Sequence, residues 1–132
     1  LNPLHLQHIY GSVNDIAIDD LMSGYYVGIE EDLKTTDYGS MISNAADLAV
    51  FVRALNTGGL LNKEETTLYN EIYELEHTGL IPGYQSFVSY HADLDAVIVQ
   101  FVNTTNFDGY EWNLAEVMLG RVTDILDKQV LN

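Results

Sequence analysis

Two apolar stretches joined by a short polar segment constrain the fold of this chain more than any other feature. The run from Tyr84 to Tyr90 alternates and is rich in aromatic and β-branched residues, which predicts a strand. Residues 96–102 (AVIVQFV) are apolar on both faces, as expected of a central strand that is covered on each side. The polar residues 91–95 predict the turn between them, and Pro82-Gly83 predicts the bend that leads into the first strand.

The clearest helix of the sequence is predicted to begin after an N-cap at Ser43 or Asn44. Asp47 lies in its first turn, where a carboxylate interacts favourably with the helix dipole. Gly58-Gly59 ends the run. The apolar residues that recur at helical spacing, and that assign this helix to packing, are Leu48, Phe51, Val52 and Leu55.

Two more helices are predicted from capping boxes. One begins at Asn62 with Glu65 three residues later, and its pattern changes from helix to strand near residue 72. The last begins after Asn113, with Glu116 in the box position, and carries one apolar stripe. Residues 1–24 predict mostly loop, 25–30 a short extended piece, 31–38 a polar link and 103–109 a polar loop.

These elements predict an α+β layer in which two or three antiparallel strands are flanked by helices. We divide the chain into a loop-rich and helical segment, residues 1–71, and a segment of strands with a C-terminal helix, residues 72–132. Together they are expected to form part of one larger domain. The sequence opens at Leu1 without a methionine or signal peptide, so we expect a fragment or a processed piece.

Charge and composition exclude several classes of function. Twenty acidic residues against five basic ones give a net charge of −15, which argues against nucleic acid and anionic membrane surfaces as partners. No apolar run is long enough to span a bilayer. The absence of cysteine excludes disulfides and a thiol nucleophile. His5 and His8 are spaced for one helix face, but no third ligand stands nearby, so we predict no metal and no cofactor.

Three ordered segments carry a family resemblance. Residues 77–103 (HTGLIPGYQSFVSYHADLDAVIVQFVN) resemble the third motif and following hairpin of the serine β-lactamase and penicillin-binding-protein-like hydrolases. The resemblance is to the branch of class C β-lactamases, D-alanyl-D-alanine carboxypeptidases and esterases. Residues 1–10 (LNPLHLQHIY) are similar to its Pro-Leu segment, with His5 where a glycine usually stands. Residues 38–55 (YGSMISNAADLAVFVRAL) resemble its Ser-Thr-x-x-Asp-Leu helix.

The resemblance implies that part of the active site is missing from these residues. The family's Ser-x-x-Lys and Tyr-x-Asn motifs lie upstream of the Pro-Leu segment, and neither pattern occurs in this sequence. The chain therefore resembles the C-terminal half of such a hydrolase, without the N-terminal strands and the nucleophile helix, and is expected to be inactive alone. The expected partner is that N-terminal half or a second copy of the chain, because residues 96–102 would otherwise leave an exposed strand edge.

The same resemblance assigns roles to the third motif. Leu80 would supply a backbone N–H to the oxyanion of the tetrahedral intermediate. Thr78 would offer its hydroxyl to a substrate carboxylate or carbonyl, and His77 takes the place of the usual lysine. An ordinary strand histidine is the alternative for His77. Since histidine is mostly neutral at pH 7, this exchange favours an esterase or peptidase-like hydrolase over a dedicated β-lactamase.

Four residues are implied to bind the substrate. Gly79 would let the substrate lie against the strand, Tyr84 would contact it, and Asn103 and Asn106 would bind a carboxylate. The substrate would be a small molecule or peptide, and the family implies a periplasmic or secreted protein. Two other readings stay open: a non-catalytic module that binds a peptide or peptidoglycan stem, and a purely structural fragment.

Overall fold

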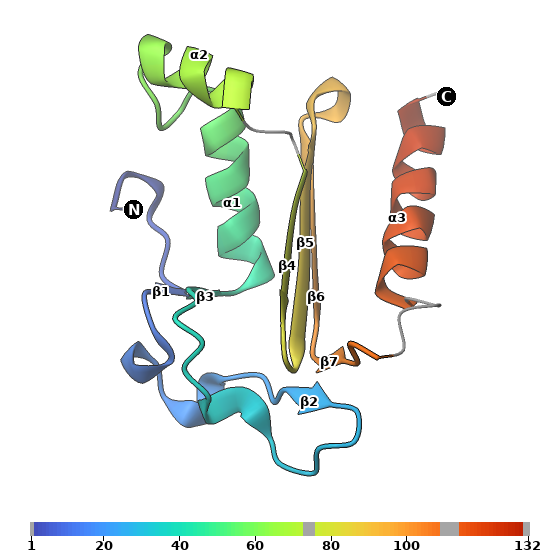
Figure 1. The fold of residues 1–132 in the computed structure, drawn as a ribbon. Coiled ribbons are helices and arrows are strands. Elements are labelled where there is room, and N and C mark those ends of the chain that lie inside the picture. Colours follow the sequence, from blue (N-terminus) through green and yellow to red (C-terminus); the bar gives the residue numbers. More distant parts are fainter. Residues whose placement is uncertain (1, 73–75, 109–113, 131–132) are drawn as a thin grey trace.

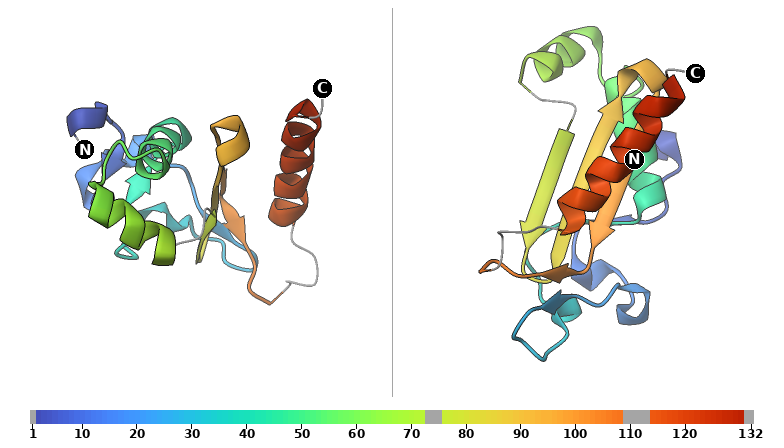
Figure 2. Two further views of the ribbon diagram at one scale, coloured as in Figure 1. Left: turned by 90° about the horizontal axis from the view of Figure 1, so that it is seen from above. Right: turned by 90° about the vertical axis from the view of Figure 1, so that its right-hand side faces the viewer.

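The computed structural model describes residues 2–72, 76–108 and 114–130 of the chain. Over these residues the fold is α+β, as predicted, with an antiparallel sheet between helices (Figure 1). Helix α1 (Ala45–Asn56) covers one face of the sheet and α3 (Leu114–Val130) lies on the other (Figure 2). Helix α2 (Lys63–Ile72) follows α1. No described helix is both long and apolar enough to cross a membrane.

The main sheet has three strands in the order β4-β5-β6, and all neighbours are antiparallel. Strands β4 (Glu76–Ile81) and β5 (Tyr84–His91) join through Pro82-Gly83, where Gly83 has a φ of 90°. Strand β6 (Ala96–Val102) has the predicted bounds. Among the described residues β6 is an edge strand, as expected for this chain without further strands, and β5 takes the central position that the apolar faces of β6 predicted for β6. Its two apolar faces have another cause: α1 and α3 pack on opposite faces of this edge strand.

Alternation along the strands divides the sheet into two packed faces. On the face toward α1, Val52 of the helix packs with Val88 and Tyr90 of β5, and each of these residues is at most 9% exposed. On the opposite face Ile98 is 8% exposed and Ala115 of α3 is 6% exposed. The Gln100 side chain donates a hydrogen bond to the Ala115 carbonyl at 2.9 Å, which ties α3 to β6.

The helix caps follow the sequence prediction. Asn44 is the N-cap of α1, and its side chain accepts a hydrogen bond from the Asp47 N–H at 2.7 Å. In the capping box of α2, the Glu65 carboxylate accepts from the Asn62 N–H at 2.8 Å and the Asn62 side chain accepts from the Glu65 N–H at 3.0 Å. The predicted cap of the last helix, Asn113, and the helix-to-strand change at residues 73–75 lie outside the described residues.

The first 44 residues contain only short elements, so the loop predicted for residues 1–24 is largely confirmed. Strand β1 (Ile9–Tyr10) pairs antiparallel with β3 (Ile42–Ser43). Strand β2 (Tyr25–Tyr26) is shorter than the predicted extended piece. It pairs in parallel with β7 (Thr104–Thr105), a strand that lies within the loop predicted for residues 103–109. The 3-10 helices are η1 (Asn2–Leu4), η2 (Val13–Asp15), η3 (Ile18–Asp20), η4 (Leu33–Thr35) and η5 (Ala92–Leu94).

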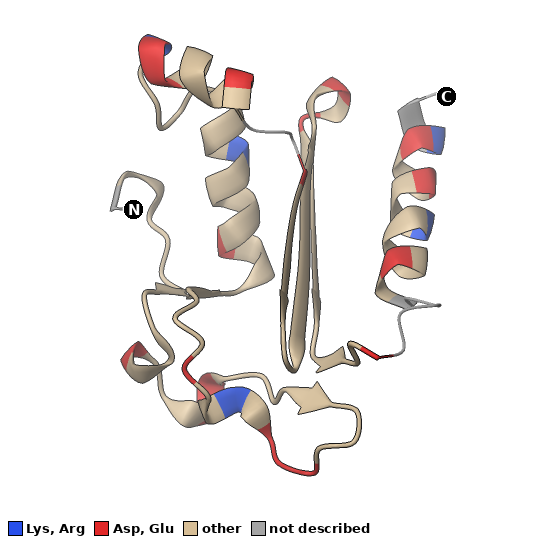
Figure 3. Cartoon of the chain, viewed as in Figure 1, with Lys and Arg blue, Asp and Glu red and all other residues tan. Residues whose placement is uncertain are grey.

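Charged side chains lie mainly on helices and turns, and most of the strand residues of the main sheet are uncharged (Figure 3). One ion pair connects α1 to the β5–β6 turn: Arg53 Nε donates to Asp95 Oδ1 at 2.9 Å, and Tyr90 donates to the same oxygen at 3.2 Å. The Arg53 guanidinium holds the pKa of Asp95 below its usual value. Asp95 adopts the left-handed region, with a φ of 48°, a conformation that alanine at this position would adopt only with strain. The ion pair therefore holds the backbone of this turn.

We predict that Thr105→Val destabilises the protein. Thr105 is 4% exposed, and its hydroxyl accepts a hydrogen bond from the Gly83 N–H at 2.7 Å. Valine has the same shape but cannot accept, so the buried N–H loses its partner at a cost of about 1–3 kcal/mol. The measurement is the free energy of unfolding in denaturant. The control is Thr104→Val, at the exposed neighbouring position, which should change that energy by less than about 0.5 kcal/mol. Equal effects would contradict the assignment.

Candidate functional site

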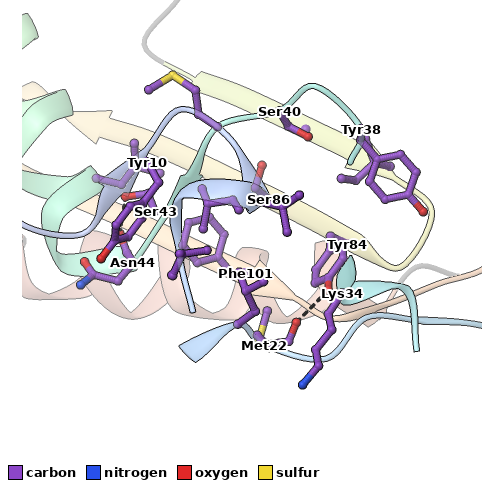
Figure 4. Close-up of a pocket in the computed structure, with 18 of the residues that line it drawn as sticks. Tyr10, Met22, Lys34, Tyr38, Ser40, Ser43, Asn44, Tyr84, Ser86 and Phe101 are labelled. Atoms are coloured by element: carbon purple, nitrogen blue, oxygen red, sulfur yellow. Dashed lines mark hydrogen bonds between the residues drawn. The ribbon is translucent and has the colours of Figure 1, made fainter. Parts of the chain in front are cut away.

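A cavity of about 1030 Å³ lies between the N-terminal segment and the turn end of the main sheet (Figure 4). Its walls come from both halves of the chain: residues 8–44 form one side, and α1, β4, β5 and β6 form the other. Volume and lining are those of a small-molecule pocket, since such pockets are concave and mostly apolar with few polar groups. Its aromatic lining residues are Tyr10, Tyr38, Phe51, Tyr84 and Phe101.

Tyr84, predicted to contact substrate, lines this cavity and also holds the N-terminal segment. Its hydroxyl donates a hydrogen bond to the Met22 carbonyl at 2.7 Å (Figure 4). A Cβ placed on Gly24 would lie 2.3 Å from the Tyr84 ring, so only glycine fits beneath the ring. Burial raises the pKa of Tyr84 to about 12, and the nearby Asp32 carboxylate adds to the shift. Tyr84 is therefore both a wall of the cavity and an anchor for residues 22–24.

His77 lies in a second cavity. This smaller space, of about 410 Å³, lies between α1, α2 and the sheet, and His77 and Tyr69 bring polar groups to an otherwise apolar lining. The register pairs His77 with Val88, so its side chain lies on the sheet face toward α1. Leu48 and Phe51 line both cavities, so the two spaces are neighbours along α1.

Thr78 and Leu80 have their side chains on the opposite face of β4, because successive residues of a strand alternate. Both side chains are exposed, and Leu80 is 47% exposed. The structure therefore places His77 and Gly79 together on the cavity side and separates them from the Thr78 hydroxyl. The role implied for Leu80 uses its backbone and does not depend on the direction of its side chain.

The backbone of Leu80 lies at an open sheet edge. Strand β4 is the outer strand of the main sheet, and among the described residues no strand pairs with its other side. Ile81 pairs with Tyr84 around the Pro82-Gly83 turn, and Leu80 pairs with Gln85. The pair that closes such a turn is hydrogen-bonded and the next pair is not. We infer that the Leu80 N–H is directed away from β5, toward the free edge beside the larger cavity.

Ser86 is a site residue that sequence reasoning missed. It pairs with Gly79 and lines the larger cavity, where a Cβ on Gly79 would lie 2.6 Å from its Oγ. Its hydroxyl makes no hydrogen bond to the residues that the structure describes, whereas the cavity hydroxyl of Ser43 donates to the Asn44 carbonyl at 2.9 Å. The Pro82-Gly83 turn was the available signal, because counting pairs back from it places Ser86 opposite Gly79.

Asn103 and Asn106 do not line either cavity. The Asn103 side chain donates a hydrogen bond to the Ser23 carbonyl at 3.0 Å, and its own carbonyl accepts from the Tyr25 N–H at 2.9 Å. The Asn106 side chain accepts from the Asp108 N–H at 3.1 Å within its loop. Both side chains therefore hold backbone segments in this structure.

Side chains of both charges line the larger cavity, and its carboxylates outnumber its ammonium groups by two to one. Asp20 and Asp37 line it, with Lys34 and His8 as the basic side chains. The Lys34 ammonium points away from the aromatic residues (Figure 4). His8 lies 3.4 Å from the Asp47 carboxylate, which also accepts its N–H. No group of three or more potential metal ligands occurs within residues 2–72, 76–108 and 114–130.

We predict that Tyr84 ionises about two pH units above an ordinary tyrosine and that Tyr84→Phe removes this ionisation step. The pKa of Tyr84 is about 12 in the folded protein and about 10 in the unfolded chain. Unfolding therefore releases a proton between these values, so stability falls as the pH rises through that window. Tyrosinate absorbance during alkaline titration measures the step. Tyr10→Phe, in the same cavity, is the control and should leave this step in place. An absorbance change near pH 12 that is as large in Tyr84→Phe as in the original protein would refute the assignment.

Comparisons of this chain with protein-family models, with curated protein sequences and with solved structures find no match in any of the three. The resemblance to serine β-lactamase-like hydrolases stays a prediction from the sequence motifs.

Proposed function

We propose that this chain supplies one wall of the active site of a β-lactamase-like serine hydrolase that hydrolyses an ester, peptide or β-lactam by acyl transfer. The observation that carries the proposal is the position of the His-Thr-Gly-Leu sequence on β4, whose outer edge is unpaired among the described residues and lies beside a cavity of about 1030 Å³. The strand register directs the Leu80 N–H toward that edge. A backbone N–H fixed by a sheet is a suitable donor to an oxyanion, because it needs no reorganisation during the reaction.

The reaction needs a nucleophile from residues outside this sequence. A serine of a Ser-x-x-Lys segment attacks the carbonyl carbon, and the Leu80 N–H donates a hydrogen bond to the carbonyl oxygen as it becomes negative. Collapse of the tetrahedral intermediate expels the alcohol or amine and leaves an acyl-serine, which water then hydrolyses. Gly79 carries no side chain toward the cavity, so a substrate can lie close to β4.

His77 is proposed to act from the second cavity, two residues from Gly79 on the same face of β4. In that position it would orient the proton network of the incoming serine. Asp20 and Asp37 outnumber Lys34 in the lining of the larger cavity, and this excess of negative charge disfavours an anionic substrate. The acidic lining and the exchange of lysine for histidine both favour neutral esters over β-lactams that carry a carboxylate.

A non-catalytic binding module is the second candidate. The observation that favours it is the absence of Ser-x-x-Lys and Tyr-x-Asn from the 132 residues. The same cavity and strand edge would then hold a peptide or peptidoglycan stem without cleaving it. The complete gene separates the two candidates: an upstream Ser-x-x-Lys supports the hydrolase, and a gene without one leaves only the binding module.

We predict that Leu80→Pro abolishes most ester turnover while the fold is retained. Proline lacks the N–H but is tolerated on edge strands where that N–H faces outward. Loss of one oxyanion donor lowers kcat by about 10²–10³-fold. The measurement is hydrolysis of p-nitrophenyl acetate by the nucleophile-containing protein, meaning this chain joined to its Ser-x-x-Lys segment. Circular dichroism reports the fold.

Leu80→Ala is the matched control for that experiment, because it removes an exposed side chain and keeps the N–H. It should retain turnover within a few-fold of the original protein. A Leu80→Pro protein that is folded and fully active would refute the role of this N–H. A Leu80→Pro protein that is unfolded would refute the inferred direction of the N–H toward the free edge.

We also predict that the nucleophile-containing protein hydrolyses p-nitrophenyl acetate with a higher kcat/KM than nitrocefin, because the cavity lining is acidic and lacks the motif lysine. His77→Ala should lower ester turnover, and steady-state kinetics on both substrates measure it. Unchanged rates in His77→Ala would remove this residue from the site. The 132-residue chain alone should turn over neither substrate.

A further inference from the structure

We propose that the larger cavity selects an elongated, uncharged carbonyl compound, such as a medium-chain ester, and that Ser86 donates a hydrogen bond to it. This inference deepens the proposed function and rests on it for the reaction, but the binding itself does not require a nucleophile. The cavity volume of about 1030 Å³ exceeds what a short acyl group fills.

The lining favours an apolar chain. Leu48 and Phe51 of α1, Phe101 of β6 and Ile42 of β3 surround the space with aliphatic and aromatic side chains. Apolar surface of this kind strengthens binding by about four-fold for each methylene that it removes from water. A chain of several methylenes therefore gains much more from this cavity than an acetyl group does.

The polar groups of the lining favour a neutral ligand. The Tyr84 hydroxyl and the Ser43 hydroxyl are already bonded to backbone carbonyls. Asp37 accepts hydrogen bonds from the Asn14 side chain at 3.2 Å and the Gly39 N–H at 2.8 Å. Asp20 and Asp37 outnumber Lys34 in the lining. This excess of negative charge repels an anion, so a fatty acid or a carboxylated β-lactam binds less well than an ester or ketone of the same length.

Ser86 is a polar group on the β4–β5 wall that can orient such a ligand. Its hydroxyl lies opposite Gly79, next to the Leu80 backbone, and makes no hydrogen bond to the described residues. A carbonyl oxygen can accept from Ser86 when the ligand binds, and the chain then extends along Leu48 and Phe51. Ser86 is therefore a positioning residue for the substrate, and it is separate from the Leu80 N–H that stabilises the oxyanion.

Calorimetric titration of the 132-residue chain tests the binding. Methyl hexyl ketone is a neutral carbonyl compound that cannot be hydrolysed, and it should bind on the order of a hundred-fold more tightly than methyl ethyl ketone. Octanoate should bind more weakly than methyl hexyl ketone. Ser86→Ala should weaken the binding of methyl hexyl ketone by about three- to ten-fold. Ser89→Ala is the control, because Ser89 lies on the opposite face of β5 and bonds the His91 ring.

Octanoate binding as tight as that of the ketone, or a ketone affinity that Ser86→Ala leaves unchanged, would overturn the inference. Turnover by the nucleophile-containing protein then separates it from the proposed function. If p-nitrophenyl acetate is hydrolysed as well as p-nitrophenyl octanoate and no ketone binds, the cavity inference fails and the hydrolase stands. If the ketone binds through Ser86 and neither ester is hydrolysed, the hydrolase fails and the binding site stands.

Discussion

The pairing of β4 with β5 around Pro82-Gly83 is the interaction on which the candidate site depends. This register places Gly79 opposite Ser86 and Leu80 opposite Gln85. A shift of one residue would move every side chain to the other face. The Thr78 and Leu80 side chains would then lie on the sheet face toward α1, and the Leu80 N–H would turn into the sheet. Gly83 allows the turn through its φ of 90°, and the bond from its N–H to Thr105 holds the turn in place.

Local sequence signals were sufficient for the helix ends and for the turn. The caps at Asn44 and Asn62 are hydrogen bonds that span three residues or fewer, so the residue types in one window specify them. Pro82-Gly83 specifies the hairpin for the same reason. These features also give the register of β4, and with it the open edge at Leu80 and the pairing of Ser86 with Gly79.

Strand order and the cavity could not be predicted in this way, because they depend on contacts between distant residues. The apolar residues on both faces of β6 indicate that both faces are covered. They do not indicate whether β6 is a central or an edge strand of the sheet. The bond from Tyr84 to the Met22 carbonyl joins positions 62 residues apart, and Asn103 to Ser23 joins positions 80 apart. Asparagine and tyrosine at such positions carry no signal for a particular backbone partner.

The wall formed by the N-terminal segment is held by polar contacts more than by burial. Met22, Val27 and Ile29 are each 45% or more exposed, so these residues contribute little hydrophobic stabilisation. Hydrogen bonds from the Tyr84 hydroxyl and the Asn103 side chain, and from the Tyr25 N–H to the Asn103 carbonyl, attach the wall to the sheet and its exit. The rigid strand edge and the cavity thus have different sources of stability. A substitution that loosens the wall should therefore affect ligand binding before it affects the sheet that carries the Leu80 N–H.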